Sequence, residues 1–206
     1  MVLKKQNVLD LIFLPLRFLL PHEFLPKIGL TSLREERLQK VLSCCEGKLL
    51  DIGCGEKNKL VRSYRNSNNC GIGLDIYAWE GVDVISDSQS LPFKEGTFDT
   101  ITLAAILNHI IDSKKALEES YRVLKNGGYI LITMISPIVG IFRHKLIAWW
   151  DKDQNERGMK KGEKYGISQR EMVNLLKRTG FREIKKENFL FNMNNIYIAR
   201  KGSCKL

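Results

Sequence analysis

The 206-residue chain lacks several features that would place it in a specialised class of protein. No stretch repeats at a fixed period, which excludes a solenoid or a propeller. Proline and glycine occur at ordinary levels, so collagen-like and linker-dominated chains are excluded as well. With 44% apolar and 27% charged residues, the chain is too polar for an integral membrane bundle and too apolar for a disordered protein. Its length suits one domain with a full core, or a domain with a short appendage.

The chain also lacks a cysteine pattern that would indicate a metal site or a disulfide framework. Its five cysteines are odd in number, match no zinc spacing, and include the adjacent pair Cys44 and Cys45. Asp151 and Asp153 lie close together in the sequence, but no further side chains complete a metal-ligand set. We therefore expect reduced thiols, no bound metal and a cytoplasmic location.

The apolar stretch near the N-terminus is too short to cross a bilayer. Residues 8–20 form a run of thirteen that is interrupted by Asp10, Pro15 and Arg17, and no small-residue cleavage site for a signal peptide follows it. Two interpretations stay open for residues 1–30. They form either an apolar cap packed on the domain or a segment whose residues 1–28 lie on a membrane surface.

Charge is distributed unevenly along the chain. The net charge is +3 over residues 1–50, −3 over 51–100, +3 over 101–150 and +7 over 151–206. A basic last quarter attracts nucleic acid, anionic lipid or an acidic substrate, but its lysines alternate with glutamates, which is typical of a solvated face. The acidic second quarter favours a cationic ligand and opposes a polyphosphate.

Apolar periodicity predicts alternating strands and helices from Ser32 onward. Capping boxes at Ser32 and Ser168 each open a helix, and Gly127-Gly128 is expected to end another. Strands that alternate with helices predict a doubly wound α/β fold, a mostly parallel seven-stranded sheet with an antiparallel hairpin at its C-terminal end. Strands are expected at 48–52, 71–77, 82–85, 98–105, 129–135, 182–191 and 195–200, and helices at 32–42, 56–66, 113–125, 137–150 and 168–179.

Ligands of such sheets bind at the carboxyl ends of the strands, so the residues after each strand are the candidate site. Asp51-Ile-Gly53-Cys54-Gly55 follows the first strand, and its two glycines allow a sharp turn and a close approach to a ligand. The dinucleotide fingerprint needs a third glycine where this chain has Asn58, so the loop suits a nucleoside without a diphosphate. A plain strand-to-helix turn is the alternative interpretation.

Acidic side chains follow the next two strands. Asp75 lies 24 residues after Asp51, and a carboxylate there can accept hydrogen bonds from both hydroxyls of a ribose. The alternative for Asp75 is an exposed acidic strand end. Asp87, in the loop after the third strand, could accept from an exocyclic adenine amine. Together these positions predict a site for a cationic nucleoside.

Five segments then match one known family in order and spacing, and they cover about the middle half of the chain. The chain resembles the class I S-adenosylmethionine-dependent methyltransferases of the broad type 11 group, which includes ubiquinone/menaquinone-biosynthesis-like methylases. The resemblance implies the seven-stranded sheet, S-adenosylmethionine as cofactor and S-adenosylhomocysteine as product. The matching segments are LLDIGCG at 49–55, GLDIY at 73–77, SDSQSLPF at 86–93, GTFDTITLAAILNHI at 96–110 and ALEESYRVLKNGGYILITM at 116–134.

The resemblance also implies roles for individual residues. Asp75 would hold the ribose, and Asp87 with Ser88 would contact the adenine. The family often carries a third glycine or alanine near Asn58, where this chain departs from the pattern. The full cofactor-binding set implied by the resemblance is Asp51, Gly53, Cys54, Gly55, Asp75, Ile76, Asp87, Ser88 and Ala104.

Methyl transfer is an in-line displacement, so an enzyme accelerates it mainly by alignment and by exclusion of water. A base is needed only where the acceptor atom carries a proton of high pKa. His109, after the fourth strand, is the candidate base, and a helix-capping or core histidine is the alternative. Asn108, Arg157 and Tyr165 are the candidate substrate contacts.

The sequence therefore predicts methyl transfer to a small-molecule or lipid-like acceptor. Two alternatives stay open: a catalytically inactive scaffold that binds the cofactor, and an RNA methyltransferase. The intact Asp75 and glycine turn oppose the scaffold. A nucleic acid acceptor is disfavoured, since DNA amino-methylating enzymes carry an Asn/Asp/Ser-Pro-Pro-aromatic motif where this chain reads Leu-Ala-Ala-Ile at 103–106. The methylated atom and the oligomeric state are left open.

Overall fold

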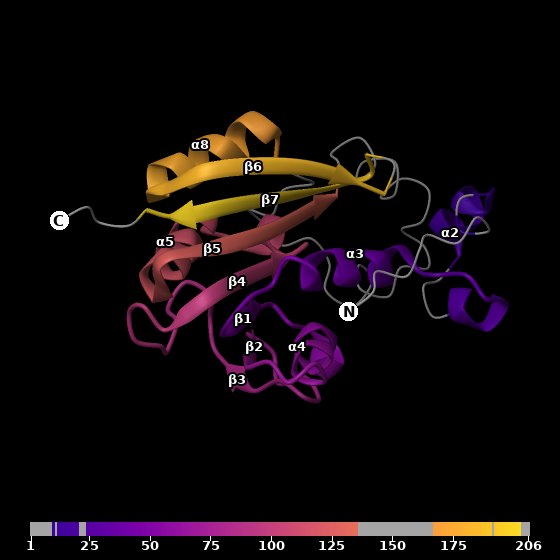
Figure 1. The fold of residues 1–206 in the computed structure, drawn as a ribbon, viewed down its shortest axis with the longest axis horizontal. Helices are drawn as coiled ribbons and strands as arrows, with labels where there is room; N and C mark the ends of the chain where they lie inside the picture. Colours follow the sequence, from indigo (N-terminus) through magenta and orange to yellow (C-terminus); the bar gives the residue numbers. More distant parts are fainter. Residues whose placement is uncertain (1–9, 11, 21–23, 136–166, 191, 203–206) are drawn as a thin grey trace.

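The protein folds around a seven-stranded mixed sheet (Figure 1). The computed structural model describes residues 10, 12–20, 24–135, 167–190 and 192–202. Strand order is β3-β2-β1-β4-β5-β7-β6. Strand β7 runs antiparallel to the other six strands, which are parallel to one another. The predicted doubly wound fold and its C-terminal antiparallel pair are confirmed.

The strands and helices alternate along the chain up to the C-terminal pair. The strands are β1 (Leu49–Ile52), β2 (Gly71–Asp75), β3 (Val84–Ile85), β4 (Phe98–Ala104), β5 (Leu124–Ile135), β6 (Phe181–Phe189) and β7 (Asn194–Lys201). The described α-helices are α2 (Leu14–Leu19), α3 (Leu33–Leu42), α4 (Lys59–Arg65), α5 (Ser113–Val123) and α8 (Gln169–Thr179). Three 3-10 turns join them, η1 (Leu25–Ile28), η2 (Glu56–Asn58) and η3 (Leu107–His109).

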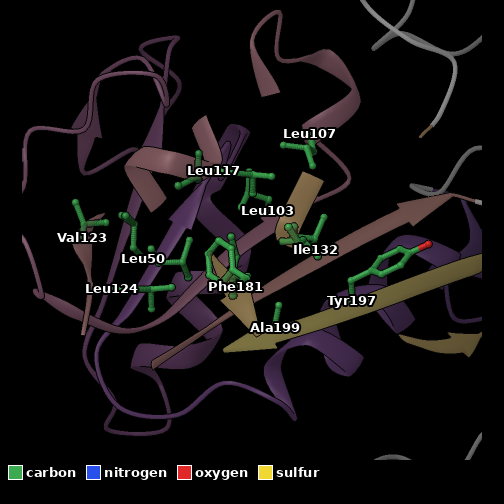
Figure 2. Packing of buried hydrophobic residues seen from close by; sticks show 14 of the residues in the cluster. Leu50, Leu103, Leu107, Leu117, Val123, Leu124, Ile132, Phe181, Tyr197 and Ala199 are labelled. Atoms are coloured by element: carbon green, nitrogen blue, oxygen red, sulfur yellow. The ribbon is translucent and has the colours of Figure 1, made fainter. Parts of the chain in front are cut away.

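Helices cover both faces of the sheet. On one face α5 and α8 contribute Leu117 and Leu176 to a buried cluster that includes Ile132, as Figure 2 shows in part. On the other face α3 and α4 pack on the cluster that contains Leu131. Because successive side chains of a strand point to opposite faces, a strand buried on both sides is continuously apolar, as most of β5 is.

The serine of each predicted capping box caps its helix. The Ser32 hydroxyl accepts from the backbone N–H of Glu35 at 3.1 Å, and the Ser168 hydroxyl accepts from that of Glu171 at 3.2 Å. Each bond satisfies one of the free N–H groups of the first helical turn, which is typically worth about 1 kcal/mol. Gly180 ends α8 in the left-handed region, with φ of 103°.

Three expected boundaries differ from the structure. Helix α5 ends at Val123, and β5 starts directly at Leu124, so Gly127-Gly128 lies inside a strand instead of ending the helix. The helix ends early because Leu124 pairs with Phe98 of β4, and glycine is needed at position 128 because a Cβ there would lie 2.8 Å from the carbonyl oxygen of Asp99. Strand β3 has two residues, and four residues separate β6 from β7. The helix expected at 137–150 lies outside the described residues.

A buried arginine fixes the N-terminal segment to the domain. The Arg17 side chain is completely buried and donates to the carbonyl oxygens of Thr31 and Asp10, each at 2.7 Å, and to the Glu36 carboxylate. The Asp10 carboxylate accepts from the backbone N–H of Thr31 at 2.8 Å. The two charges that interrupt the apolar stretch therefore anchor it beside the start of α3.

Candidate active site

Two buried acids meet at the carboxyl ends of β1 and β2. Asp51 is 2% exposed and Asp75 is 3% exposed. The Thr102 hydroxyl, on β4, donates to Oδ1 of Asp51 at 2.6 Å. Burial, with a smaller contribution from the charge of Asp75, raises the pKa of Asp51 to about 7. Within the described part of the chain neither carboxyl forms an ion pair, so this end of the sheet favours a cationic ligand.

The glycine loop after β1 is hydrogen-bonded to the end of β2. Gly53 and Gly55 both have positive φ, 73° and 65°, which L side chains rarely adopt. A Cβ on Gly53 would lie 2.0 Å from Cδ1 of Ile106, whereas a Cβ on Gly55 would meet no atom within 4 Å. The loop thus packs tightly at Gly53 and leaves open space at Gly55. The thiol of Cys54, between them, has its pKa raised by burial and stays protonated.

Asp75 holds this loop and keeps hydrogen-bonding capacity to spare. Its Oδ2 accepts from the backbone N–H of Gly55 at 2.9 Å, and its Oδ1 accepts from that of Tyr77 at 3.0 Å. An ionised carboxylate has about four acceptor positions, so roughly two remain for a ligand. Beside it Ile76 is 59% exposed, and the Tyr77 ring packs against Trp79 in a tilted arrangement with the ring centroids 5.5 Å apart. An acceptor group and an exposed aliphatic side chain therefore lie next to each other.

Asn58 fills the position where the dinucleotide fingerprint has glycine. It is fully buried, and its Nδ2 donates to the carbonyl oxygen of Gly81 at 3.1 Å and to the Asp83 carboxylate at 3.0 Å. A Cβ on Gly73 would lie 2.3 Å from the Asn58 amide, so the two residues are packed against each other. The departure from the fingerprint therefore fixes the loop to β2 and to the turn before β3.

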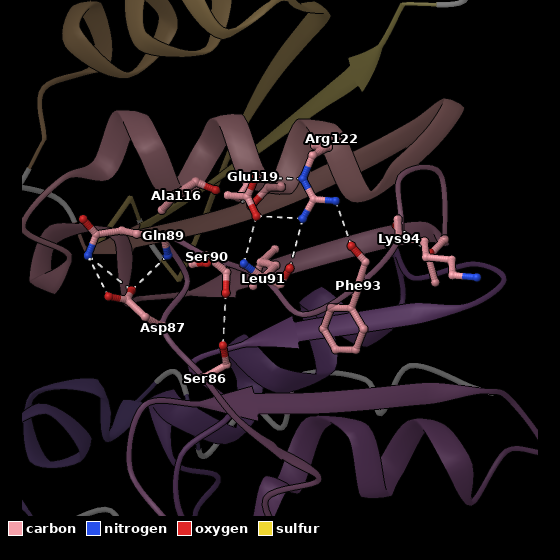
Figure 3. A network of polar contacts seen from close by, with 12 residues as sticks. Ser86, Asp87, Gln89, Ser90, Leu91, Phe93, Lys94, Ala116, Glu119 and Arg122 are labelled. Atoms are coloured by element: carbon pink, nitrogen blue, oxygen red, sulfur yellow. Dashed lines mark hydrogen bonds and ion pairs between the residues drawn. The ribbon is translucent and has the colours of Figure 1, made fainter.

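The loop after β3 is folded on itself around Asp87 (Figure 3). Oδ1 of Asp87 accepts from the backbone N–H of Gln89 at 2.9 Å and from its side-chain amide at 3.2 Å. The Ser86 hydroxyl donates to the carbonyl oxygen of Ser90 at 3.1 Å, and Ser88 is buried. Asp87 therefore has its carboxylate committed to its own loop.

Two side chains of helix α5 form hydrogen bonds to the backbone of the same loop (Figure 3). Glu119 accepts from the backbone N–H of Leu91 at 2.8 Å, and Arg122 donates to the carbonyl oxygens of Leu91 at 3.0 Å and Phe93 at 2.7 Å. Arg122 also donates to both carboxylate oxygens of Glu119, at 2.8 and 2.7 Å, and these bonds hold the pKa of Glu119 below its usual range. A loop joined to a helix in this way presents Asp87 and Ser88 in a fixed position.

The side of the sheet beyond β4 carries the candidate acceptor residues. Ala104 ends β4, and η3 follows with Asn108 and His109. Nε2 of the exposed His109 lies 3.1 Å from Nδ2 of Asn108. Asn108 also lines a cavity of about 190 Å³ with residues that include Ile111 and Leu175. Arg157 and Tyr165 lie outside the described residues, as do Asp151 and Asp153.

Two further observations concern the described residues as a whole. They contain no group of three or more His, Cys, Asp or Glu side chains that could hold a metal ion. None of the helices they form is both long and apolar enough to cross a membrane.

Sequence reasoning missed Thr102 as the partner of Asp51 and Glu119 and Arg122 as supports of the loop. A signal for Thr102 exists, because it is a polar residue among the apolar residues 101–104 that end β4. The pairing of Thr102 with Asp51 depends on the β1–β4 register, which a single sequence does not give.

Comparison with known proteins identifies the family. A profile described as a methyltransferase domain matches residues 17–186. An uncharacterized protein of Methanocaldococcus jannaschii is 28% identical over 154 residues, 71% of this chain and 70% of that protein. The ubiquinone/menaquinone biosynthesis C-methyltransferase of Marinomonas sp. is 34% identical over 87 residues, 40% of this chain. That match spans 35% of the Marinomonas enzyme.

Solved structures share the fold at low sequence identity. A structure from Thermotoga maritima, described as an S-adenosylmethionine-dependent methyltransferase and possible histamine N-methyltransferase, is 21% identical with a TM-score of 0.61. It covers 92% of this chain and 96% of its own. An S-adenosylmethionine-dependent methyltransferase from Archaeoglobus fulgidus is 18% identical with a TM-score of 0.62, covering 82% of this chain and 95% of its own. With the profile match over most of its length, the chain belongs to the class I S-adenosylmethionine-dependent methyltransferases.

Proposed function

We propose that this methyltransferase acts on a small, lipid-like acceptor that it meets at the cytoplasmic surface of a membrane. In this proposal residues 31–206 form the methyltransferase domain, and residues 1–30 form the segment that contacts the membrane. The observation that carries the proposal is a group of exposed apolar side chains on the N-terminal segment.

The site residues fit the S-adenosylmethionine that the family uses. Open space at Gly55 admits the chain of the cofactor's amino acid part, and the acidic end formed by Asp51 suits its positive charge. Asp75 has acceptor positions to spare for ribose hydroxyls, and exposed Ile76 offers an apolar surface for the adenine. The cofactor supplies an electrophilic methyl group on a sulfonium sulfur.

The residues of the chain then act by position more than by acid-base chemistry. Gly53 and Asp75 fix the loop that orients the donor, and Ala104 keeps its side of the site small. Alignment of the acceptor atom with the methyl carbon is the main source of acceleration in such a transfer. His109 is exposed beside Asn108, and it takes a proton only where the acceptor is a hydroxyl or a protonated amine.

The N-terminal segment presents an apolar surface that no described element covers. The buried Arg17 fixes α2 to the start of α3, so these side chains are displayed on an anchored support. Exposed Lys27 lies within the same segment and suits anionic lipid headgroups. Apolar side chains with a basic residue among them are typical of segments that lie in a membrane interface. The exposed side chains are Ile12, Phe13, Leu16, Phe24 and Ile28, with exposed fractions of 63%, 42%, 38%, 44% and 44%.

The name of one relative supports an acceptor of this kind. The Marinomonas enzyme is named for ubiquinone and menaquinone biosynthesis, and it is 34% identical over 87 residues of this chain. The name belongs to that enzyme, and the match spans 35% of its length. It supports a lipid-like acceptor as a hypothesis for this chain.

The membrane part is tested by flotation with vesicles that contain an anionic lipid. The double variant Ile12→Ser, Phe24→Ser removes two exposed side chains, and we expect partitioning to fall about tenfold or more. Ile85→Ser is the matched control, because Ile85 is 61% exposed on β3 and outside the segment. Equal partitioning of the wild type and the double variant would refute membrane contact.

The acceptor is tested by incubating the protein and labelled S-adenosylmethionine with membrane lipid extract or with bulk RNA. Label in the organic phase supports the proposal. Label in RNA would support the RNA alternative, with affinity that falls as salt rises. Cofactor binding without label in either fraction would support the scaffold alternative.

A further inference from the structure

Two polar atoms buried at one end of the sheet have no hydrogen-bond partner. They are the hydroxyl oxygen of Thr133, on β5, and the side-chain carbonyl oxygen of Asn194, on β7. The residues are 0% and 3% exposed. Nearly all buried polar atoms in folded proteins are paired with protein or with ordered water, so unpaired ones indicate a missing partner.

The two side chains lie on the same face of the sheet. In β5, Thr133 is two residues from Leu131, and in β7, Asn194 is two residues from Ile196, so each shares its neighbour's face. Leu131 and Ile196 both belong to the cluster on the α3 and α4 side. Thr133 pairs with Ile196, and Asn194 pairs with Ile135, which makes the two residues diagonal neighbours roughly 7 Å apart. The two unpaired oxygens therefore belong to neighbouring side chains on one face of the sheet.

This position continues the active site away from the cofactor side. Ala104, at the end of β4, is in register with Thr133, and the backbone N–H of Ala105 donates to the Thr133 carbonyl oxygen at 3.0 Å. Asp51 and Thr102 are in register with each other on the next strands along the sheet, two positions before Ala104. A line across this face therefore runs from Asp51 and Thr102, past Ala104, to Thr133 and Asn194.

We propose that Thr133 and Asn194 bind a hydroxyl group of the methyl acceptor. The Asn194 carbonyl oxygen only accepts, and the Thr133 hydroxyl both donates and accepts. A single hydroxyl complements them by donating to Asn194 and accepting from Thr133. The inference rests on the proposed function in requiring a small acceptor, and it holds equally for an acceptor that is not at a membrane.

The test compares two ligands that differ in one group. 1-Naphthol and 1-fluoronaphthalene are similar in shape, and only the first donates a hydrogen bond. Equilibrium dialysis against the protein saturated with S-adenosylhomocysteine gives both affinities. We expect the wild type to prefer 1-naphthol by about tenfold, the loss typical of one buried hydrogen bond. Thr133→Val and Asn194→Ala should reduce this preference severalfold, and Thr133→Ser, which keeps the hydroxyl, should retain it.

A second measurement separates this role from a structural one. Thr100, on β4, is a buried threonine whose hydroxyl donates to the carbonyl oxygen of Glu46 at 2.6 Å. Thr100→Val should lower the thermal midpoint, and Thr133→Val should leave it unchanged or raise it, since no bond is lost. The affinity of Thr133→Val for the cofactor should stay within about twofold of the wild-type value.

The inference is overturned if the wild type shows no preference for 1-naphthol, including the case in which neither ligand binds. It is also overturned if the preference survives in both Thr133→Val and Asn194→Ala, since the hydroxyl would then bind elsewhere. Failure of the membrane proposal appears in the flotation experiment alone and leaves the dialysis result standing. The two proposals therefore fail separately.

Discussion

Replacing Asp51 by asparagine is expected to stabilise the protein above neutral pH. Burial raises the pKa of this carboxyl to about 7, from an ordinary value of 3.8. At pH 8 the folded protein therefore holds an ionised carboxylate away from water, with Asp75 nearby. The carbonyl oxygen of the new asparagine can still accept the bond that Thr102 donates at 2.6 Å, so the change removes charge and keeps the geometry.

The magnitude follows from the difference between the folded and unfolded pKa. A shift of about 3 units corresponds to roughly 4 kcal/mol, an upper value for the cost of ionising Asp51 in the folded state. The pKa of Asp51 is higher in the folded than in the unfolded protein. The wild type therefore has its full stability below the unfolded pKa of 3.8 and loses stability as the pH rises to about 7. Between pH 5 and 8 this one group lowers the free energy of unfolding by about 2–3 kcal/mol.

Urea denaturation of wild type and Asp51→Asn between pH 5 and 8 measures the effect. The stability difference between the two proteins should grow as the pH rises from 5 to about 7 and then stay constant, with the variant more stable. Asp99→Asn is the control, because we expect it to lower the stability of the protein where Asp51→Asn raises it. Hydrogen bonds from Lys125 and Lys48 lower the pKa of Asp99 against the opposing effect of burial, so its ionised form stabilises the fold. Parallel curves, or a variant less stable than wild type at pH 8, would refute the reasoning.

Two further substitutions test the cofactor side of the site. Asp75→Asn turns an acceptor for the N–H of Gly55 into a possible donor and removes a charge. Calorimetric titration should therefore show S-adenosylmethionine binding weakened about 10- to 100-fold, as expected for the loss of a charge-assisted hydrogen bond. Unchanged affinity would exclude Asp75 from the site. Gly53→Ala forces an L side chain to a φ of 73° and a Cβ within 2.0 Å of Ile106. We expect a loss of about 2–4 kcal/mol in urea denaturation, and a loss below 0.5 kcal/mol would show that the loop is free to rearrange.

The cofactor side of the site follows from local sequence, and the acceptor side does not. Asp51 and Asp75 are found because each ends a short apolar run, and parallel strands bring their carboxyl ends together. Thr133 and Asn194 become neighbours only through the β5–β7 register, which joins residues 61 positions apart. No periodicity within either segment reports that contact.

Boundaries failed where tertiary contacts override a local signal. Gly127-Gly128 is a strong helix-ending pattern, yet the helix ends earlier, at Val123, because β5 must start there to pair with β4. In the same way Arg17 reads as a break in an apolar stretch, and the structure makes it the anchor of that stretch. A charge in an apolar run is ambiguous in sequence, since a buried partner far along the chain decides its role.

The place of β7 inside the sheet sets an order on folding. β7 pairs with β5 on one side and with β6 on the other, and β6 has no other partner in the described sheet. A nascent chain can therefore assemble β1 to β5 as they leave the ribosome, but β6 has nothing to pair with until Asn194–Lys201 has emerged. During that interval the edge of β5 is open, and an exposed apolar edge strand is a template for aggregation. Translation stalled before Asn194 would leave β6 unpaired and one edge of β5 open, so quality control by chaperones is expected to act at this step.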